Sequence, residues 1–244
     1  MTAGGPLLVL DTATREAVVG VAEPGGTLVA LERWTAGYRH GEELLARVEA
    51  ALAAAGTTLA GLGGIVVGTG PGAFTGLRVG IATAKGLAHA ASLPIAGVST
   101  GEALLRAAAA EAGGEAPAAE AGGEAPAADA DRAALVLLLP AGPSDRVVCR
   151  PGTPPALLPG GDEPDLRPGE LVLALDLDGR APADALRRGA AARDGLARAL
   201  AALGVERLRA GGDDLARLVP EYVTLPRGVR SDVPEAAVHV ARGG

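Results

Sequence analysis

Short apolar runs bounded by turn residues alternate with longer amphipathic segments through the first hundred residues. The short runs predict strands at residues 7–10, 17–22, 27–34, 65–67 and 94–98. Apolar positions spaced by three and four predict helices at residues 41–55 and 76–90. Ser99 can cap a third helix that runs through Ala110. The predicted order is three strands followed by alternating helices and strands.

This order predicts a mixed sheet with helices on its faces. It is the element order of an actin/RNase H-like lobe. Weaker patterns follow in the second half, with strands expected at residues 134–139, 147–150 and 171–175. A helix is expected to start at Pro182 and to end at Gly204. We therefore predict an α/β protein with two lobes, the second a degenerate copy of the first.

A tandem duplication separates the two halves. AGGEAPAAE at residues 112–120 returns as AGGEAPAAD at residues 121–129. Nine residues are too few for a solenoid repeat, and the composition is typical of a flexible surface linker. The expected organisation is a first lobe at residues 1–111, a linker at 112–130, and a second lobe at 131–244 whose tail is irregular from Val219.

Charge and aromatic content argue against a protein that binds RNA by itself. The formal net charge is −7, and aromatic residues make up 2% of the chain. An acidic chain repels phosphate backbones at long range, and few aromatic side chains are available to stack on bases. A basic patch created by folding is still compatible with this composition.

One cysteine and the lack of long apolar runs bear on location. Cys149 is the single cysteine, so it has no partner for an internal disulfide, and we expect it to be buried and unreactive. The first ten residues carry no basic region typical of a signal peptide. No apolar run reaches the ~20 residues that span a bilayer. These features predict a cytoplasmic protein without a membrane partner.

The glycine-rich segment GTGPGAFTGLRVGIATAK, residues 68–85, follows a predicted strand. A P-loop requires a lysine directly after its last glycine, but Leu77 follows Gly76. Gly68, Gly70 and Ala73 imitate a dinucleotide fingerprint, but the following strand lacks the acidic residue that would bind the ribose. A tight turn from strand to helix is the remaining interpretation.

Small residues recur at every fourth position of the helix predicted after this loop. They are Gly76, Gly80, Ala84 and Ala88. Such a stripe allows a second helix to approach closely. Two interpretations remain open: the stripe packs on the chain's own sheet and neighbouring helix, or it is buried in a partner subunit. Arg78 and Lys85 are seven residues apart, so they share one face.

Asp11, Thr12 and Thr14 follow the first predicted strand. Actin-like ATPases place an acidic loop for phosphate and Mg²⁺ at this position, which makes these residues weak phosphate-loop candidates. The corresponding strand of the second half ends at residues 139–142 without an acidic residue. We therefore favour an Asx-type turn and expect no cofactor.

No metal site or catalytic group is predicted. His40, His89 and His239 do not have the spacing of metal ligands. Asp176 and Asp178 begin like a calcium loop but lack its downstream ligands, so we expect a turn after a strand. No nucleophile paired with a base can be assigned.

Four segments together resemble the TsaB (YeaZ-type) family. They are VLDTAT at residues 9–14, RHGEELL at 39–45, GTGPGAFTGLRVGIATAKGLA at 68–88 and PIAGVST at 94–100. They occur in the family's order and spacing and cover about residues 7–105. PEYVTLP at residues 220–226 loosely resembles the family's C-terminal segment. LLLPAGPSDRVV at residues 137–148 departs from the strand and acidic hairpin that usually open the family's second lobe.

The resemblance implies a two-lobed actin/Hsp70-like fold and a role in modifying tRNA. Family members are non-catalytic subunits of the bacterial complex that installs threonylcarbamoyl on adenosine 37 of tRNAs reading codons that begin with A. They pair with a homologous catalytic subunit, TsaD, which carries a metal site, and an ATPase, TsaE, joins the complex. They can also form a homodimer through the same helices of the first lobe. Binding of tRNA is expected only through the complex.

The resemblance also indicates an interface on the two helices of the first lobe. The candidate residues are Glu42, Leu45, Gly76, Arg78, Gly80, Ala84, Lys85 and His89. Gly80→Leu is then expected to abolish pairing while the monomer stays folded. The alternatives are an actin-like ATPase or sugar kinase, a metallopeptidase-like enzyme, or a dinucleotide-binding domain. The enzymes require a complete second phosphate loop or a pair of metal ligands.

Overall fold

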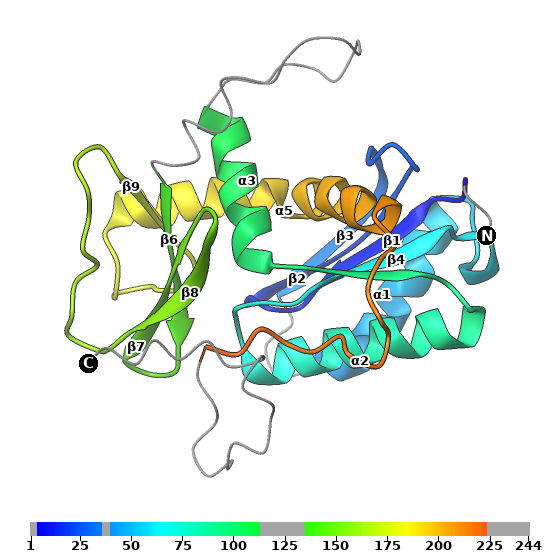
Figure 1. The fold of residues 1–244 in the computed structure, drawn as a ribbon, viewed down its shortest axis with the longest axis horizontal. Coiled ribbons are helices and arrows are strands. Elements are labelled where there is room, and N and C mark those ends of the chain that lie inside the picture. The colour runs from blue at the N-terminus through cyan, green and yellow to red at the C-terminus, as the bar shows by residue number, and fades with distance from the viewer. Residues whose placement is uncertain (1–3, 36–39, 113–134, 224–244) are drawn as a thin grey trace.

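The computed structural model describes residues 4–35, 40–112 and 135–223, which form two mixed sheets (Figure 1). The first sheet has the strand order β3-β2-β1-β4-β5. Its strands are β1 (Leu7–Asp11), β2 (Glu16–Ala22), β3 (Leu28–Thr35), β4 (Gly64–Gly68) and β5 (Ile95–Val98). β1, β2 and β3 are antiparallel neighbours, whereas β4 is parallel to β1 and β5 to β4. All five strands expected in this half are confirmed.

The second sheet repeats the connectivity of the first with one strand fewer. Its strands are β6 (Leu135–Ala141), β7 (Asp145–Arg150), β8 (Thr153–Leu158) and β9 (Leu171–Ala174), in the order β8-β7-β6-β9. β9 is parallel to β6, as β4 is to β1. The sequence analysis missed β8 because it contains Pro154 and Pro155, which lack the N–H of a central strand. An edge strand tolerates them.

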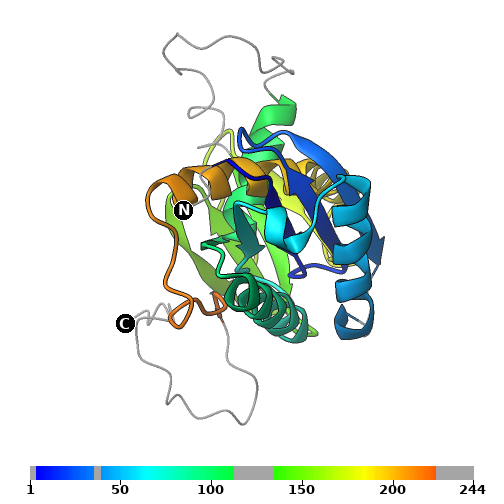
Figure 2. The same cartoon turned by 90° about the vertical axis from the view of Figure 1, so that its right-hand side faces the viewer.

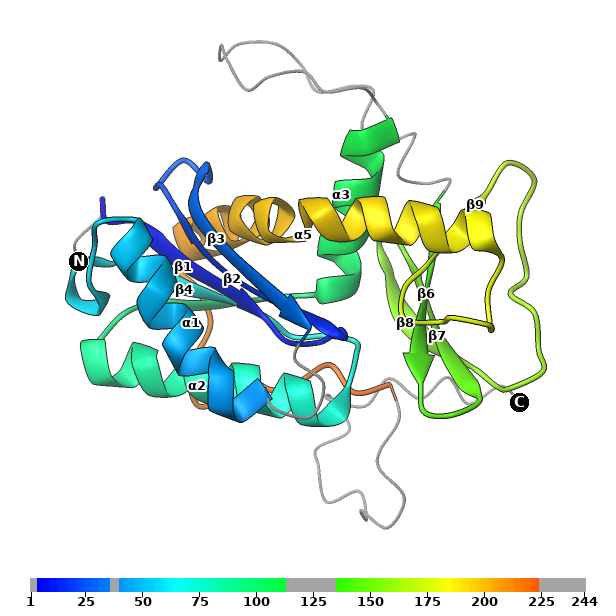
Figure 3. The same ribbon diagram turned by 180° about the vertical axis from the view of Figure 1, so that it is seen from behind.

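Helices cover the first sheet on both faces (Figures 1 and 3). α1 (His40–Ala54) and α2 (Phe74–Ala91) lie on one face, with the short η1 (Leu59–Gly61) between them in sequence. α3 (Thr100–Ala112) and the long α5 (Ala183–Arg209) lie on the other face, and α5 extends along both sheets. The Oγ of Ser99 accepts a hydrogen bond from the Glu102 N–H at 3.4 Å, so the expected cap of α3 is confirmed.

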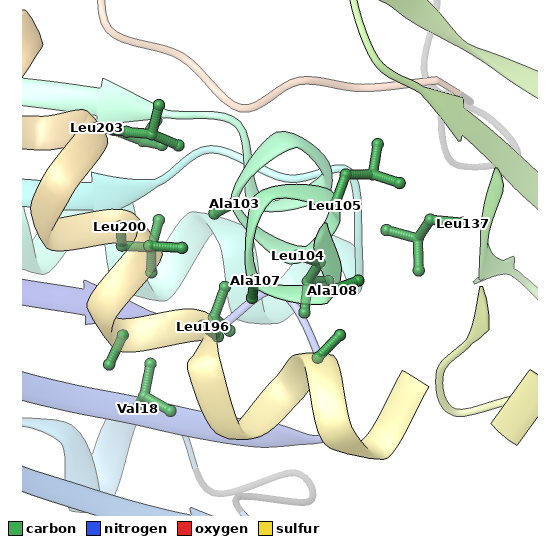
Figure 4. Packing of buried hydrophobic residues seen from close by; sticks show 14 of the residues in the cluster. Val18, Ala103, Leu104, Leu105, Ala107, Ala108, Leu137, Leu196, Leu200 and Leu203 are labelled. Carbon is green, nitrogen blue, oxygen red and sulfur yellow. The ribbon is translucent and has the colours of Figure 1, made fainter. Parts of the chain in front are cut away.

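The largest core lies where α3 and α5 meet between the two sheets (Figure 4). Leu200 of α5 packs toward α3, whose Leu104 is also fully buried. Leu105 of α3 faces Leu137 of β6, which ties the helix pair to the second sheet. A second core fills the space between the first sheet and the helices α1 and α2. Because one core joins elements of both halves, burial of apolar surface holds the two sheets together.

The predicted end of the last helix at Gly204 is wrong, because α5 continues to Arg209. A Cβ on residue 204 would overlap the side chain of Val66 in β4. Glycine therefore allows α5 to pack closely on the first sheet. This packing keeps residue 204 helical although glycine has a low helix propensity. Gly204 thus marks a close contact between α5 and β4 and not the end of the helix.

An irregular strap, residues 211–223, follows α5 and returns along β5 and α2 (Figure 2). The Asp213 N–H donates to the carbonyl oxygen of Ile95 at 2.8 Å, and the Gly97 N–H donates to Asp213 Oδ2 at 2.7 Å. Arg207 donates to the carbonyl oxygen of Gly97. The strap and Arg207 thus form hydrogen bonds with backbone groups of β5 at the edge of the sheet. Without these bonds the edge groups would be available for pairing with a strand of another chain.

Most of the predicted linker at 112–130, and the tail beyond residue 223, lie outside the described residues. The lobe limits at 1–111 and 131–244 stay a prediction, since the structure locates only the last residue of α3 and the first of β6.

Candidate functional site

The turn after β1 uses its polar groups inside the protein. Asp11 is completely buried. Its Oδ1 accepts the Ala13 N–H at 2.8 Å, and its Oδ2 accepts the hydroxyl of Thr100 at 2.6 Å. Thr12 Oγ1 donates to the carbonyl oxygen of Gly76 at 2.7 Å, and Thr14 Oγ1 donates to that of Glu16 at 2.8 Å. The expected Asx-type turn is confirmed.

The glycine-rich loop between β4 and α2 lies directly on this turn. The Ala73 N–H donates to the carbonyl oxygen of Ala13 at 2.7 Å, and the Gly70 N–H donates to Thr100 Oγ1 at 3.1 Å. A Cβ on Gly68 would overlap the carboxylate of Asp11. These close approaches require glycine, which confirms the interpretation of the loop as a tight turn from strand to helix.

Burial controls the protonation of Asp11. Desolvation raises the pKa of its carboxyl group to about 6, although hydrogen bonds from Thr100 and Ala13 to the charged form lower it in part. The folded pKa lies above the unfolded one, so the folded protein binds more protons between about pH 4 and pH 6. The contribution of Asp11 to the free energy of unfolding therefore falls as the pH rises through this window.

Asp11→Asn should remove this pH dependence, because an amide does not titrate. Between about pH 4 and pH 7 the wild type should lose roughly 3 kcal/mol of unfolding free energy relative to the variant. Urea unfolding can be followed by the fluorescence of Trp34, the single tryptophan of the chain. Parallel pH profiles for the two proteins would contradict the raised pKa.

The stripe of small residues on α2 faces the chain's own first lobe. Gly76, Gly80, Ala84 and Ala88 are all buried. A Cβ on Gly80 would overlap the Oγ1 of Thr12, which is already engaged with α2. The first of the two open interpretations therefore describes these residues. This packing argues against the expectation that Gly80→Leu leaves the monomer folded, because the leucine side chain would have to displace Thr12.

Arg78 and Lys85 bind the chain's own strap. Arg78 Nε donates to the Tyr222 hydroxyl at 2.8 Å, and its guanidinium lies 3.8 Å from the centre of the Phe74 ring. Lys85 Nζ donates to the carbonyl oxygen of Leu218 at 3.2 Å. The shared face predicted for the two cations is correct. Its occupant in this structure is a segment more than 130 residues away in sequence.

A different set of small side chains on α2 is exposed. They are Thr75, Ala82, Gly86 and Ala90. Nothing lies within 4 Å of a Cβ built on Gly86. The spacing of four between positions 82, 86 and 90 was present in the sequence, but the buried stripe has the same spacing, and periodicity alone does not distinguish them. We call these four residues, together with the exposed His89, the open face of α2.

α1 lies in the same helical layer, on the same side of the first sheet (Figure 3). Leu45 on α1 is 53% exposed, the highest exposed fraction among the large apolar residues in the described part of the chain. Ala46 and Ala50 are exposed on the same helix. Glu42 belongs to α1, but its side chain lies outside the described part of the structure. Leu45 and His89 are thus the two sequence candidates with described side chains that are exposed and do not bind the strap.

Within the described ranges, no three His, Cys, Asp or Glu side chains come close enough to share a metal ion. Cys149 is buried as expected, and burial raises the pKa of its thiol. Asp176 and Asp178 lie in the turn after β9, as predicted. No helix in the described residues has both the length and the apolar content needed to cross a bilayer.

Comparisons with known proteins agree with the sequence motifs. Residues 34–138 match the family model described as TsaD, tRNA N6-adenosine threonylcarbamoyltransferase. The chain is 38% identical over 94 residues to the tRNA threonylcarbamoyladenosine biosynthesis protein TsaB of Escherichia coli, a match covering 38% of this chain and 40% of that protein. It is 43% identical over 99 residues to an uncharacterized protein of Mycobacterium tuberculosis, covering 40% of this chain and 47% of that one. The matched region is thus less than half of either relative.

The fold extends the similarity beyond the matched sequence. YeaZ from Pseudomonas aeruginosa superposes with a TM-score of 0.64 at 22% identity, covering 89% of this chain and 99% of that chain. This likeness shows that the α/β fold with two mixed sheets is shared with YeaZ in both halves, including the second half, where the sequence matches end. Together, the sequence and structure matches confirm the resemblance to the TsaB (YeaZ-type) family.

Proposed function

We propose that this chain, whose first lobe is similar to TsaB (YeaZ-type) proteins, is a non-catalytic subunit in the biosynthesis of threonylcarbamoyladenosine in tRNA. It would pair with a TsaD-type subunit that transfers threonylcarbamoyl to adenosine 37. The support is the sequence similarity to a protein named for this biosynthesis and the match of residues 34–138 to the TsaD family model. Because the matches span less than half of the curated relatives, the activity and partners of the whole protein belong to the proposal.

The two sides of α2 are the main support for this function. Most of this helix comes from the glycine-rich segment at residues 68–88. One side is buried against Thr12 and the rest of the first lobe, and the open face presents small residues to solvent. Small exposed side chains on a helix permit close approach of a second helix, where van der Waals contact and apolar burial stabilise association. The open face of α2 is therefore the surface offered to the partner.

The sequence candidates divide into three roles under this proposal. Leu45 and His89 would contact the partner, and Glu42 remains a candidate through its place in α1. Gly76, Gly80 and Ala84 would act indirectly, because they set how closely α2 lies on its own lobe. Arg78 and Lys85 would hold the strap beside α2.

The turn after β1 supports a non-catalytic role. Asp11 accepts two internal hydrogen bonds, and the hydroxyl groups of Thr12 and Thr14 donate to backbone carbonyls. Binding of phosphate or a metal ion there would require these contacts to break and the glycine-rich loop to move. We assign the transfer chemistry to the partner and propose no cofactor for this chain.

The wider assembly follows from the same proposal. A TsaE-type ATPase would join the pair, and the chain by itself could form a homodimer through the same open face. The net charge of −7 suits a subunit that leaves contact with tRNA to the other components.

Reconstitution tests this function. The chain would be mixed with the TsaD-type and TsaE-type proteins of its organism, tRNA, ATP, threonine and the adenylate-forming enzyme, and modified adenosine would be quantified. We expect product only when this chain and the TsaD-type subunit are both present, and none from this chain without that subunit. Equal product in its absence would refute the proposed role.

A further inference from the structure

The turn after β9 in the second sheet reaches the turn after β1 in the first. Asp176 stands two residues beyond the end of β9 and has a φ of 54°, a left-handed conformation that is uncommon outside glycine. Its side chain is 8% exposed. A carboxylate with so little contact with solvent requires hydrogen-bond donors or an opposite charge beside it.

Donors from two other elements converge on this carboxylate. The backbone N–H of Arg15, in the turn between β1 and β2, donates to Asp176 Oδ2 at 2.7 Å. The guanidinium of Arg193 on α5 donates to Asp176 Oδ1 at 2.5 Å. Hydrogen bonds of this kind, between ionised partners or to an ionised acceptor, are about twice as strong as neutral ones. The contact therefore links the first sheet, the second sheet and the helix that spans them.

A neighbouring pair has different properties and provides a control. Arg15 also pairs with Asp178 at 2.8 Å, but these two side chains are 55% and 70% exposed. An exposed pair contributes little because solvent screens it. Asp178 has the same charge as Asp176 and lies two residues away, so a change there tests the effect of charge without the buried contact.

Asp176 leaves one hydrogen-bond donor of Arg193 unused. Arg193 Nε is buried and has no hydrogen-bond acceptor among the described residues. A guanidinium can bind a carboxylate through two parallel N–H groups, whereas Asp176 engages Arg193 through NH2. A small carboxylate that is free to orient could use both nitrogens of Arg193 together with the Arg15 N–H.

We propose that the Arg15 N–H and Arg193 form a carboxylate-binding site between the two sheets, and that Asp176 occupies it as an internal latch. In the wild type the tethered carboxylate excludes free anions, because an attached group has a high effective concentration. When the Asp176 side chain is removed, the site binds a free small carboxylate. This inference is independent of the proposed function in tRNA modification.

Asp176→Gly opens the site without adding backbone strain, since glycine suits a positive φ. Hydrogen–deuterium exchange of the Arg15 amide, followed by NMR on the full chain, reports on the latch. We expect this exchange to become roughly tenfold to hundredfold faster in the variant. Sodium formate at tens of millimolar should restore slow exchange in the variant, whereas sodium chloride at equal ionic strength should not. Formate should leave the wild type unchanged.

Two further variants complete the test. Asp178→Asn should change the exchange of the Arg15 amide by less than about twofold, because it removes only an exposed pair. If Asp176→Gly does not fold, Asp176→Asn replaces it: the charge is lost, exchange should be faster, and formate should have no effect because the amide still fills the site. Unchanged exchange in both Asp176 variants would overturn the latch. Faster exchange in folded Asp176→Gly without any response to formate would overturn the carboxylate site.

Discussion

Gly80→Leu is expected to destabilise the first lobe strongly, with a loss of about 3 kcal/mol of unfolding free energy. A Cβ at this position already overlaps the Oγ1 of Thr12, and that hydroxyl donates to the carbonyl oxygen of Gly76. A leucine would have to move the turn after β1 away from α2 or break this buried hydrogen bond, which leaves the buried Thr12 hydroxyl without an acceptor. Chemical denaturation followed by Trp34 fluorescence would measure the loss.

Gly86→Ala provides the matched control on the same helix. Nothing lies within 4 Å of a Cβ at this position, and residue 86 is exposed. Alanine has a higher helix propensity than glycine, so this variant should be more stable by about 0.5 to 1 kcal/mol. A wild-type stability for Gly80→Leu would mean that α2 is not packed on Thr12 as the structure has it. Because Gly80→Leu alters folding, its effect on pairing says nothing about an interface.

Gly86→Trp is expected to abolish pairing with the TsaD-type subunit while the monomer stays folded. The indole would project from the open face of α2, where a partner helix needs small side chains to approach. We expect the affinity to fall by at least roughly a hundredfold, because a clash at a close contact discriminates strongly. Modified adenosine in the reconstituted reaction should fall to the amount formed without this chain. Analytical ultracentrifugation of the mixed subunits would measure pairing directly.

Ala190→Trp is the control for an added indole. Ala190 is exposed on α5, which lies on the opposite face of the first sheet from α1 and α2 (Figure 3), so this variant should pair and support product formation normally. Leu45→Glu tests α1 independently: it replaces an exposed apolar side chain and should also weaken pairing. Normal pairing by both Gly86→Trp and Leu45→Glu, with reconstitution still dependent on the chain, would place the interface elsewhere without refuting the function.

The first lobe could be predicted closely because its signals are local. Apolar runs of strand length alternate there with helices of clear period, and turn residues separate them. In the second lobe one strand was not predicted and one helix end was predicted wrongly, for a shared reason. The prolines of β8 and the glycine at position 204 are unfavourable locally, but an edge position and close packing on Val66 accommodate them. Tertiary context overrode local propensity in both cases.

In the candidate site, too, local contacts could be predicted and long-range contacts could not. The Asx-type turn at Asp11 was predictable, since its hydrogen bond to Ala13 spans two residues. The latch at Asp176 was not, because Arg15 lies 161 residues away in sequence. The sequence showed only an acidic turn after a strand at that position, and nothing in its spacing pointed to a donor in the other half.

The order of elements in the first lobe, the turn at Asp11 and a helix with small and cationic faces can all be deduced from local sequence patterns. The partners of each face of that helix become known only from the folded chain. Thr12 contacts Gly76 of the buried stripe although the two are 64 residues apart in sequence. Tyr222 contacts Arg78 although these two are 144 residues apart. Periodicity along a helix defines which residues share a face, whereas burial of that face depends on distant segments that folding brings against it.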